Sequence, residues 1–132
     1  MIWKMETLTT NGVNIKIETF YQSKHSIPLE NKYIFAYKVT ITNLRKNRIK
    51  LLDRYWRIFD SNGSERTVQG KGVVGEQPIM EGGMTHEYVS WTNLLSDLGK
   101  MEGFFRMIDL VTNELFKVKI PSFKLFPPFK SN

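Results

Sequence analysis

The residues best suited to chemistry lie in a glycine-rich segment between positions 70 and 78. Gly70, Gly72 and Gly75 satisfy the pattern G-x-G-x-x-G. In dinucleotide-binding proteins this pattern follows a strand and opens a helix whose amino end holds pyrophosphate. Here Pro78 comes three residues after the last glycine, and two further glycines follow it. Because a helix cannot form in such a broken stretch, the sequence does not favour a dinucleotide fold.

The same segment could still hold a small anion. The backbone N–H groups of a glycine-rich loop can converge on one anion, and a lysine in the loop would add charge. The candidate anion loop comprises Gly70, Lys71, Gly72, Gly75, Gln77 and, from a preceding strand, Arg54. The alternative is a loop between sheets whose glycines only supply the positive φ angles that tight turns need. The sequence leaves both interpretations open.

No set of residues with the pattern of an enzyme active site is visible elsewhere. The two histidines, His25 and His86, lie on separate segments without paired carboxylates, and the thirteen acids are scattered singly. Catalytic zinc is typically held by three protein ligands, and no such cluster can be read from the spacing. The serines lack a glycine elbow. We therefore expect no catalytic residues, no metal site and no cofactor.

Composition indicates one domain spanning residues 1–132, with enough apolar residues for a core. The chain is 41% hydrophobic and 24% charged, with nine phenylalanines, five tyrosines and three tryptophans, and such aromatic content favours strands. No cysteine occurs, which predicts a reducing, cytoplasmic location. Neither a signal peptide nor a run of about 20 apolar residues is present, so no membrane association is expected.

A formal charge of +6 is unevenly distributed along the chain. Six basic residues lie between Arg45 and Arg57, with Asp53 as the only acid among them. They could guard a strand edge in a solvated turn, or they could form a positive surface for phosphate groups. The total charge is modest beside that of dedicated nucleic-acid binders, so nucleic acid is not favoured as a partner.

Alternating polarity predicts strands along most of the chain. Tyr33 to Thr42 carries the clearest pattern, with every second residue apolar. We expect strands at 13–21, 33–42, 48–59, 65–69, 85–92, 104–111 and 115–120. The 48–59 segment should pair back on 33–42 as a hairpin, with a bulge near Leu51 to Asp53 where the alternation slips.

The remaining segments are predicted as follows. Residues 1–11 form an N-terminal extension, 93–102 could hold a helical turn, and 121–132 form an extended tail held to the body by its aromatic residues. Trp56 and Trp91 are both expected to be buried. The sum is an all-β chain, an immunoglobulin or fibronectin III-like β-sandwich of about seven antiparallel strands. Its free strand edges would allow a homodimer.

Several motifs together resemble the ApaG family, also called the DUF525 domain, over nearly the whole chain from about Val13. They are Tyr33-x-Phe35-Ala36-Tyr37, Thr40-Ile41-x-Asn43, Leu51-Leu52-x-Arg54-x-Trp56, Gly70-x-Gly72-Val73-Val74-Gly75-x-Gln77-Pro78, Met101-x-Gly103 and Ile120-Pro121-x-Phe123-x-Leu125. The sequence departs from the family pattern at Tyr55, where a histidine is common, and at Trp91, where a glycine is common.

The resemblance implies a fibronectin III-like sandwich and a function without an established catalytic activity. The family is linked by name to cobalt and magnesium efflux, and related domains in eukaryotes look like interaction modules. We therefore expect a non-enzymatic binding module with a protein partner. The alternative is a sensor of a small anion or nucleotide, a phosphate-containing molecule of the pyrophosphate type, bound at the glycine-rich loop.

Overall fold

The computed structural model describes residues 4–128 and contains nine strands and two short 3-10 helices in that range. The strands are β1 Lys4–Thr10, β2 Val13–Tyr21, β3 Tyr33–Asn43, β4 Ile49–Asp60, β5 Glu65–Lys71, β6 Ile79–Met80, β7 Thr85–Leu94, β8 Gly99–Asp109 and β9 Leu115–Leu125. The 3-10 helices, Ser23–His25 and Pro28–Glu30, both lie in the β2–β3 connection.

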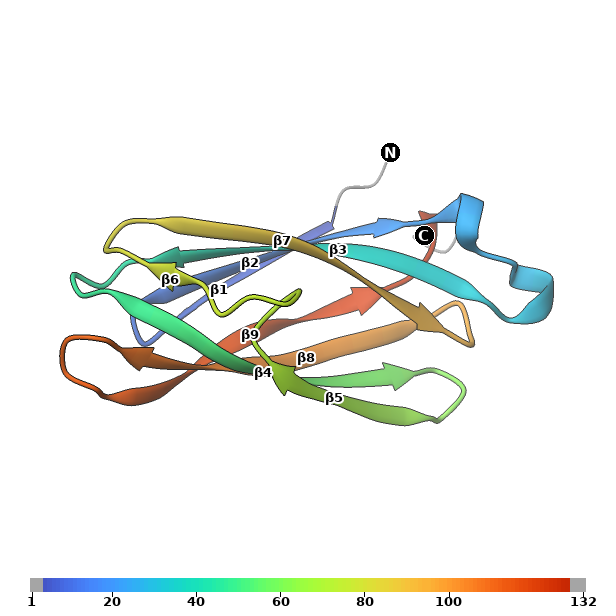
Figure 1. Cartoon of the computed structure of the whole chain (residues 1–132). Coiled ribbons are helices and arrows are strands. Elements are labelled where there is room, and N and C mark those ends of the chain that lie inside the picture. The colour runs from blue at the N-terminus through green and yellow to red at the C-terminus, as the bar shows by residue number, and fades with distance from the viewer. Residues whose placement is uncertain (1–3, 129–132) are drawn as a thin grey trace.

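Two antiparallel sheets stack on one another as a sandwich (Figure 1). The first sheet has the order β1-β2-β3-β7, and the second has the order β5-β4-β8-β9 with the short β6 paired to β4. This confirms the predicted all-β sandwich, with nine strands in place of about seven. No helix within residues 4–128 is long and apolar enough to cross a bilayer.

The two strands that were not predicted are β1 and β6. Residues 4–10, expected as part of an N-terminal extension, pair with β2 along their whole length, from Lys4 opposite Thr19 to Thr10 opposite Val13. Outward-facing polar residues weaken the alternation in β1, which is mostly exposed. β6 is only two residues long, too short for a periodic signal. Residues 1–3 and 129–132, the ends of the predicted extension and tail, lie outside the described range.

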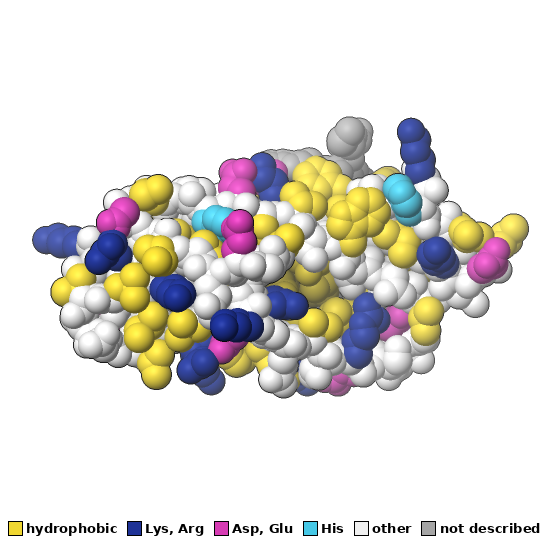
Figure 2. All heavy atoms as spheres, in the orientation of Figure 1, with side chains coloured by type: hydrophobic (Ala, Val, Ile, Leu, Met, Phe, Trp, Pro, Cys, Tyr) yellow, Lys and Arg dark blue, Asp and Glu magenta, His cyan; other side chains and the backbone are white. Residues whose placement is uncertain are grey.

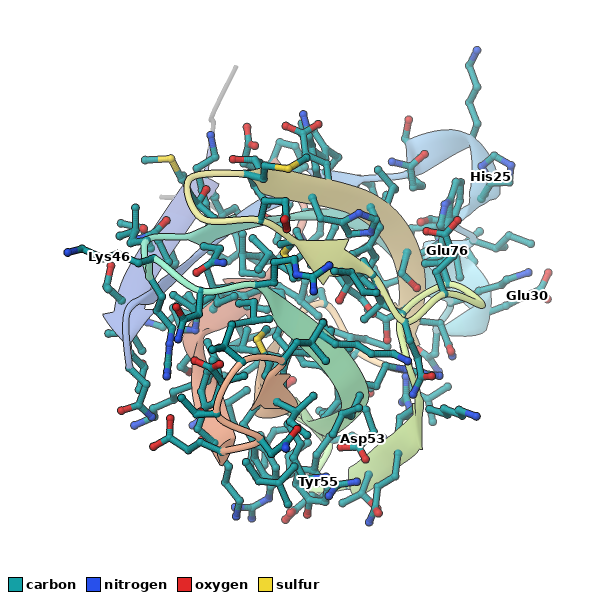
Figure 3. The ribbon with its side chains drawn as sticks, turned by 60° about the vertical axis from the view of Figure 1, so that its left-hand side comes forward. His25, Glu30, Lys46, Asp53, Tyr55 and Glu76 are labelled. Atoms are coloured by element: carbon teal, nitrogen blue, oxygen red, sulfur yellow. The ribbon has the colours of Figure 1, made fainter. Side chains whose placement is uncertain are left out.

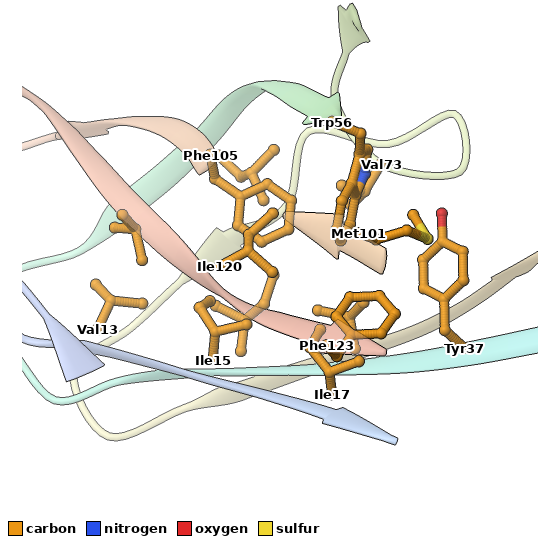
Figure 4. Close-up of a cluster of buried hydrophobic side chains, with 14 of the residues drawn as sticks. Val13, Ile15, Ile17, Tyr37, Trp56, Val73, Met101, Phe105, Ile120 and Phe123 are labelled. Carbon is orange, nitrogen blue, oxygen red and sulfur yellow. The ribbon is translucent and has the colours of Figure 1, made fainter. Parts of the chain in front are cut away.

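The core forms from the inward-facing residues of both sheets (Figure 4). In β2 the alternate residues Val13, Ile15 and Ile17 are at most 1% exposed. They point toward Phe105 and Ile120 of the second sheet, which are fully buried. Because strand side chains alternate between the two faces, the period-2 pattern of the sequence selects the buried face of each strand.

The predicted hairpin between β3 and β4 is wrong. β4 pairs with β5, β6 and β8 in the second sheet, so the chain crosses from one sheet to the other after β3. Asn43 is fully buried and holds this crossing, since its side-chain amide donates to the carbonyl oxygens of Asn47 and Met80. Both strands carry a strongly apolar face, and crossing lets these faces meet over one core. The predicted bulge is confirmed by a register shift between Leu51 and Asp53.

The helical turn predicted at 93–102 is also wrong. β7 continues to Leu94 and β8 begins at Gly99, leaving a short turn between them. Asp60 of β4 holds that turn, because its carboxylate accepts hydrogen bonds from the Leu95 amide at 2.6 Å and from the Ser96 hydroxyl. The predicted tail begins as strand, since β9 extends through residues 121–125 and pairs with the start of β8.

Candidate functional site

Two neighbouring rows of side chains run across the outer face of the second sheet. The register places Lys71 of β5, Asp53 of β4, Arg106 of β8 and Lys117 of β9 in one row. The adjacent row, two residues along each strand, contains Gln69, Tyr55, Phe104 and Lys119. Residues two apart share a face of a strand, so all eight side chains face outward together. We call these residues the outer-face rows.

The centre of the outer-face rows is an aromatic pair. Tyr55 and Phe104 lie directly opposite one another on β4 and β8, with ring centroids 5.1 Å apart and planes inclined by 19°. Such cross-strand aromatic pairs stabilise antiparallel sheets. Both rings remain partly exposed, and Figure 3 shows Asp53 and Tyr55 on the outward side of the sheet. The pair is therefore both part of the sheet and accessible from solvent.

Positive charge surrounds this pair. The ammonium of Lys117 lies 4.5 Å from the centroid of the Phe104 ring, within the range of a cation–π contact. Arg106 is paired with Asp53, its Nη2 donating at 2.6 Å. In contrast, no carboxylate of residues 4–128 lies within 4.0 Å of the ammonium groups of Lys71, Lys117 and Lys119.

The face is hollowed around the aromatic pair. A hollow of about 700 Å³ lies on the Lys71 side and contains the predicted site residues Arg54, Gly70, Lys71 and Gln77 in its wall. A second hollow of about 640 Å³ lies on the Lys119 side. The two hollows share Tyr55, Phe104 and Lys117. The outer-face rows thus form one continuous, irregular surface with aromatic residues at its centre and cations around them.

The glycine-rich segment forms a tight turn between β5 and β6. The amide of Gly72 donates to Leu52, and Val73 and Glu76 exchange backbone hydrogen bonds of 2.7 and 3.0 Å. The backbone of Gly72 has φ +67, and a Cβ there would overlap the carbonyl oxygen of Glu76. Three of the N–H groups that could have faced an anion are therefore bonded within the protein, and β6 rather than a helix follows the turn.

The structure thus separates the six predicted site residues into two groups. Gly70, Lys71, Gln77 and Arg54 meet at the same hollow, whereas Gly72 and Gly75 do not line it. Arg54 and Gln77 also support the turn. Arg54 donates to the carbonyl oxygens of Lys71 and Gly72, and the side-chain amide of Gln77 donates to Leu52 at 2.8 Å.

Sequence reasoning missed the aromatic centre of the surface. The alternation of β4 had already separated Tyr55 from the core-facing Trp56, but only the β4–β8 register brings Phe104 opposite Tyr55. Of the two tryptophans predicted to be buried, Trp56 is 2% exposed and confirms the prediction. Trp91 is 50% exposed, because the core-facing positions of β7 are the even-numbered ones.

Among the described residues no group of three or more histidine, cysteine, aspartate or glutamate side chains is arranged so that it could hold a metal ion. His86 does approach Glu76, with Nε2 and Oε2 4.0 Å apart. His25 packs edge-on against Trp91, with ring centroids 5.1 Å apart.

Comparison with known proteins identifies the family. The sequence model of the ApaG domain, DUF525, matches residues 23–109. Protein ApaG of Proteus mirabilis is 44% identical over 120 residues, which are 91% of this chain and 95% of that protein. The chain belongs to the ApaG family. The ApaG match includes the glycine turn and both central strands of the outer-face rows.

Solved structures of ApaG-like proteins share this architecture. The crystal structure of a Bordetella pertussis protein described as ApaA aligns with a TM-score of 0.84 at 30% identity, covering 96% of this chain and 95% of that one. A second crystal structure, of a structural-genomics target, aligns with a TM-score of 0.83 at 37% identity over 89% of each chain. The ApaG sandwich is therefore similar over nearly its full length in these proteins.

Proposed function

We propose that this ApaG chain is a non-enzymatic binding module that holds an acidic segment of a protein partner on the outer-face rows. The observation that carries the proposal is the exposed Tyr55–Phe104 stack beside lysines that have no carboxylate partner in the described chain. The names of the relatives describe no reaction. The lack of cysteine supports a cytoplasmic place of action.

The composition of the surface suits such a partner. Aromatic side chains are enriched in the cores of protein interfaces, and charges around them steer the partner and set its orientation. The outer-face rows carry four cations, Lys71, Arg106, Lys117 and Lys119, against the single carboxylate of Asp53. An acidic segment with an aromatic or apolar residue would place that residue on the stack and its carboxylates near the lysines.

A binding titration with variants tests this proposal. The probe is a fluorescein-labelled peptide of alternating glutamates with one central tryptophan, followed by fluorescence anisotropy at low and moderate salt. We expect binding that weakens with salt, and that weakens further, about tenfold or more, in Lys117→Glu and in Tyr55→Ala. The matched control is Lys24→Glu, which makes the same charge change in the first 3-10 helix. Equal losses in Lys24→Glu and Lys117→Glu would contradict the proposal.

A second candidate function uses the same hollow for a phosphate-containing small molecule. It is supported by the meeting of Arg54, Gly70, Lys71 and Gln77 at one wall, with Arg106 also lining the hollow. Because three of the turn amides are bonded within the protein, the side-chain cations would provide most of the recognition. Titration with pyrophosphate, ATP and diadenosine tetraphosphate tests it. Amide shifts confined to 70–77 and Arg106 support an anion site, and no shift at saturating ligand excludes it.

A further inference from the structure

A second and separate cleft opens between the two sheets, on the side where the edge strands β7 and β5 face each other. At one end Arg66 of β5 donates to the carbonyl oxygen of Asn93 at 2.7 Å. Toward the other end His86 of β7 lies near Glu76 of the glycine turn. Residues 88–91 of β7, between these two contacts, line a space of about 400 Å³. Figure 2 shows hydrophobic and basic side chains meeting on this face.

On the cleft side, no strand in residues 4–128 pairs with the backbone of β7. β7 is the last strand of the first sheet, and among the described strands only β3 pairs with it. The backbone amide of Asn43 donates to the carbonyl oxygen of Met84, so these two opposed residues form a hydrogen-bonded pair. Hydrogen-bonded and non-hydrogen-bonded pairs alternate along antiparallel strands, so the even-numbered residues of β7 bond to β3 and the odd-numbered ones do not. Val89 and Trp91 therefore direct their backbone N–H and C=O groups away from β3. The carbonyl oxygen of Asn93 also points away from β3, and it accepts the hydrogen bond from Arg66 of β5.

Arg54 places one cation in this cleft. Its side chain is partly buried, and Nη1 donates to the carbonyl oxygens of Gly72 and Lys71 at 2.9 and 3.3 Å. No carboxylate of residues 4–128 lies within 4.0 Å of its guanidinium. A partly desolvated cation without a counter-ion favours an anionic ligand.

Tyr88 adds a hydroxyl without a partner. Its oxygen is buried and makes no hydrogen bond with any residue of 4–128. Burial raises the pKa of Tyr88 well above the usual value, so the phenol is neutral and can donate. A buried hydroxyl left unpaired costs free energy, and an acceptor entering the cleft would remove that cost.

Apolar side chains complete the walls together with two further hydroxyl-bearing residues, Tyr37 and Ser90. Trp56 is almost fully buried, Trp91 is half exposed at the rim, and Val74 of the glycine turn contributes an aliphatic side chain. One cation and one unpaired hydroxyl donor match a single carboxylate better than a multiply charged phosphate. The four cations of the outer-face rows would suit a phosphate better.

We propose that this cleft binds the carboxylate of an apolar organic acid, with Arg54 and the Tyr88 hydroxyl contacting the carboxylate and the tryptophans contacting its apolar body. The acid can be a free small molecule or the C-terminus of a peptide. A peptide would also pair its backbone with the free edge at Val89 and Trp91, as in β-strand addition. This site shares Arg54 with the hollow on the Lys71 side but none of the residues of the outer-face rows, and it does not depend on the acidic-segment binding proposed for those rows.

Three probes test the cleft in the ¹⁵N-labelled protein: 3-phenylpropionate, N-acetyl-leucyl-phenylalanine and the C-terminal amide of that dipeptide. We expect the two acids to shift the indole signals of Trp56 and Trp91 and the amide of Val89, and the dipeptide amide to bind at least tenfold more weakly. Tighter binding of the dipeptide acid than of phenylpropionate assigns a peptide C-terminus, and equal binding assigns a small acid. Acid and amide binding equally, or no shift at millimolar probe, would overturn the proposal.

Tyr88→Phe is the decisive variant because it keeps the ring and removes only the unpaired hydroxyl. We expect it to fold as the parent does and to bind the acids about tenfold more weakly, the effect of one hydrogen bond to a charged group. Tyr55→Phe makes the same change on the outer face and should leave acid affinity unchanged. Unchanged affinity in Tyr88→Phe, or an equal loss in both variants, would refute the assignment of the carboxylate to this cleft.

Discussion

The guanidinium of Arg54 donates a 2.9 Å hydrogen bond to the carbonyl oxygen of Gly72, so a side chain of β4 holds the glycine turn in place. The same arginine lines both the outer-face hollow and the cleft between the sheets. It therefore connects the two surfaces through the turn that separates them.

Replacing Arg54 with glutamine should lower the free energy of unfolding by about 2 kcal/mol, because hydrogen bonds involving a charged group contribute roughly 1.5–3 kcal/mol each. Urea unfolding followed by tryptophan fluorescence measures the change. The matched control is Arg57→Gln, which removes an exposed pair with Glu65 and should lower stability far less. Equal effects of the two substitutions would show that the turn does not depend on Arg54.

Gly72→Ala and Gly75→Ala should lower the free energy of unfolding by different amounts, although both glycines have positive φ, +67 and +77. A Cβ at Gly75 meets no atom within 4 Å, while one at Gly72 overlaps the Glu76 carbonyl. We expect Gly75→Ala to lower the free energy of unfolding by about 1 kcal/mol, because alanine disfavours the left-handed backbone. Gly72→Ala should lower it by roughly 1–3 kcal/mol more, because the new Cβ displaces the turn. Thermal and urea unfolding of both variants provide the comparison. If Gly72→Ala destabilised the protein no more than Gly75→Ala, the close approach of Gly72 to the Glu76 carbonyl would be contradicted.

Phe104 and Phe105 are neighbours in sequence on opposite faces of β8, which makes them a test of the sheet register. Phe105 is fully buried, so Phe105→Ala should cost about 3–5 kcal/mol through lost burial and a cavity. Phe104→Ala should cost much less, since its ring is partly exposed on the outer face. Reversed effects in denaturant unfolding would mean that β8 is shifted by one residue.

The side-chain pattern along single strands was predictable, but the pairing between strands was not. Alternation in β2 and β3 identified the core face because buried and exposed positions alternate there. The crossing after β3 was missed because a polar turn such as 43–47 is compatible with both a hairpin and a crossing between sheets. What decides the outcome is Asn43, whose buried amide contacts Met80, a residue distant in sequence.

Because the pairing between strands could not be predicted, the candidate site was predictable only in part. Lys71 and Arg54 could be nominated from local sequence, because one lies in the glycine pattern and the other in an apolar strand. Phe104 and Lys117 could not, since only the register of three strands places them beside Tyr55. Likewise, the unpaired hydroxyl of Tyr88 depends on packing between the sheets, which a linear pattern does not encode.

Asp109 should make stability depend on pH below about 4. Its carboxylate accepts hydrogen bonds from the amides of Thr112 and Val111, then from Asn47, and lies near Arg45; these interactions outweigh desolvation and lower its pKa from 3.8 to about 2. Because the folded pKa lies below the unfolded one, the unfolded state takes up the proton first as pH falls. The stabilisation is complete above pH 4 and is lost between pH 4 and 2.

Asp109→Asn provides the measurement. Urea unfolding at pH 5 and at pH 2.5 should show a larger loss of stability in the parent protein than in the variant, because the variant has no carboxylate to protonate at this position. Other acids titrate equally in both proteins, so the difference between the two losses isolates Asp109. Identical pH dependence in parent and variant would contradict the lowered pKa.

The binding surface on the second sheet is tested most directly by mapping amide shifts of the ¹⁵N-labelled protein during titration with the acidic tryptophan-containing peptide. We predict saturable shifts at residues of the outer-face rows, above all Tyr55, Phe104 and Lys117, with little change on the outer face of the β1-β2-β3-β7 sheet. Shifts centred on that opposite sheet, or the absence of any saturable shift, would contradict binding at the outer-face rows.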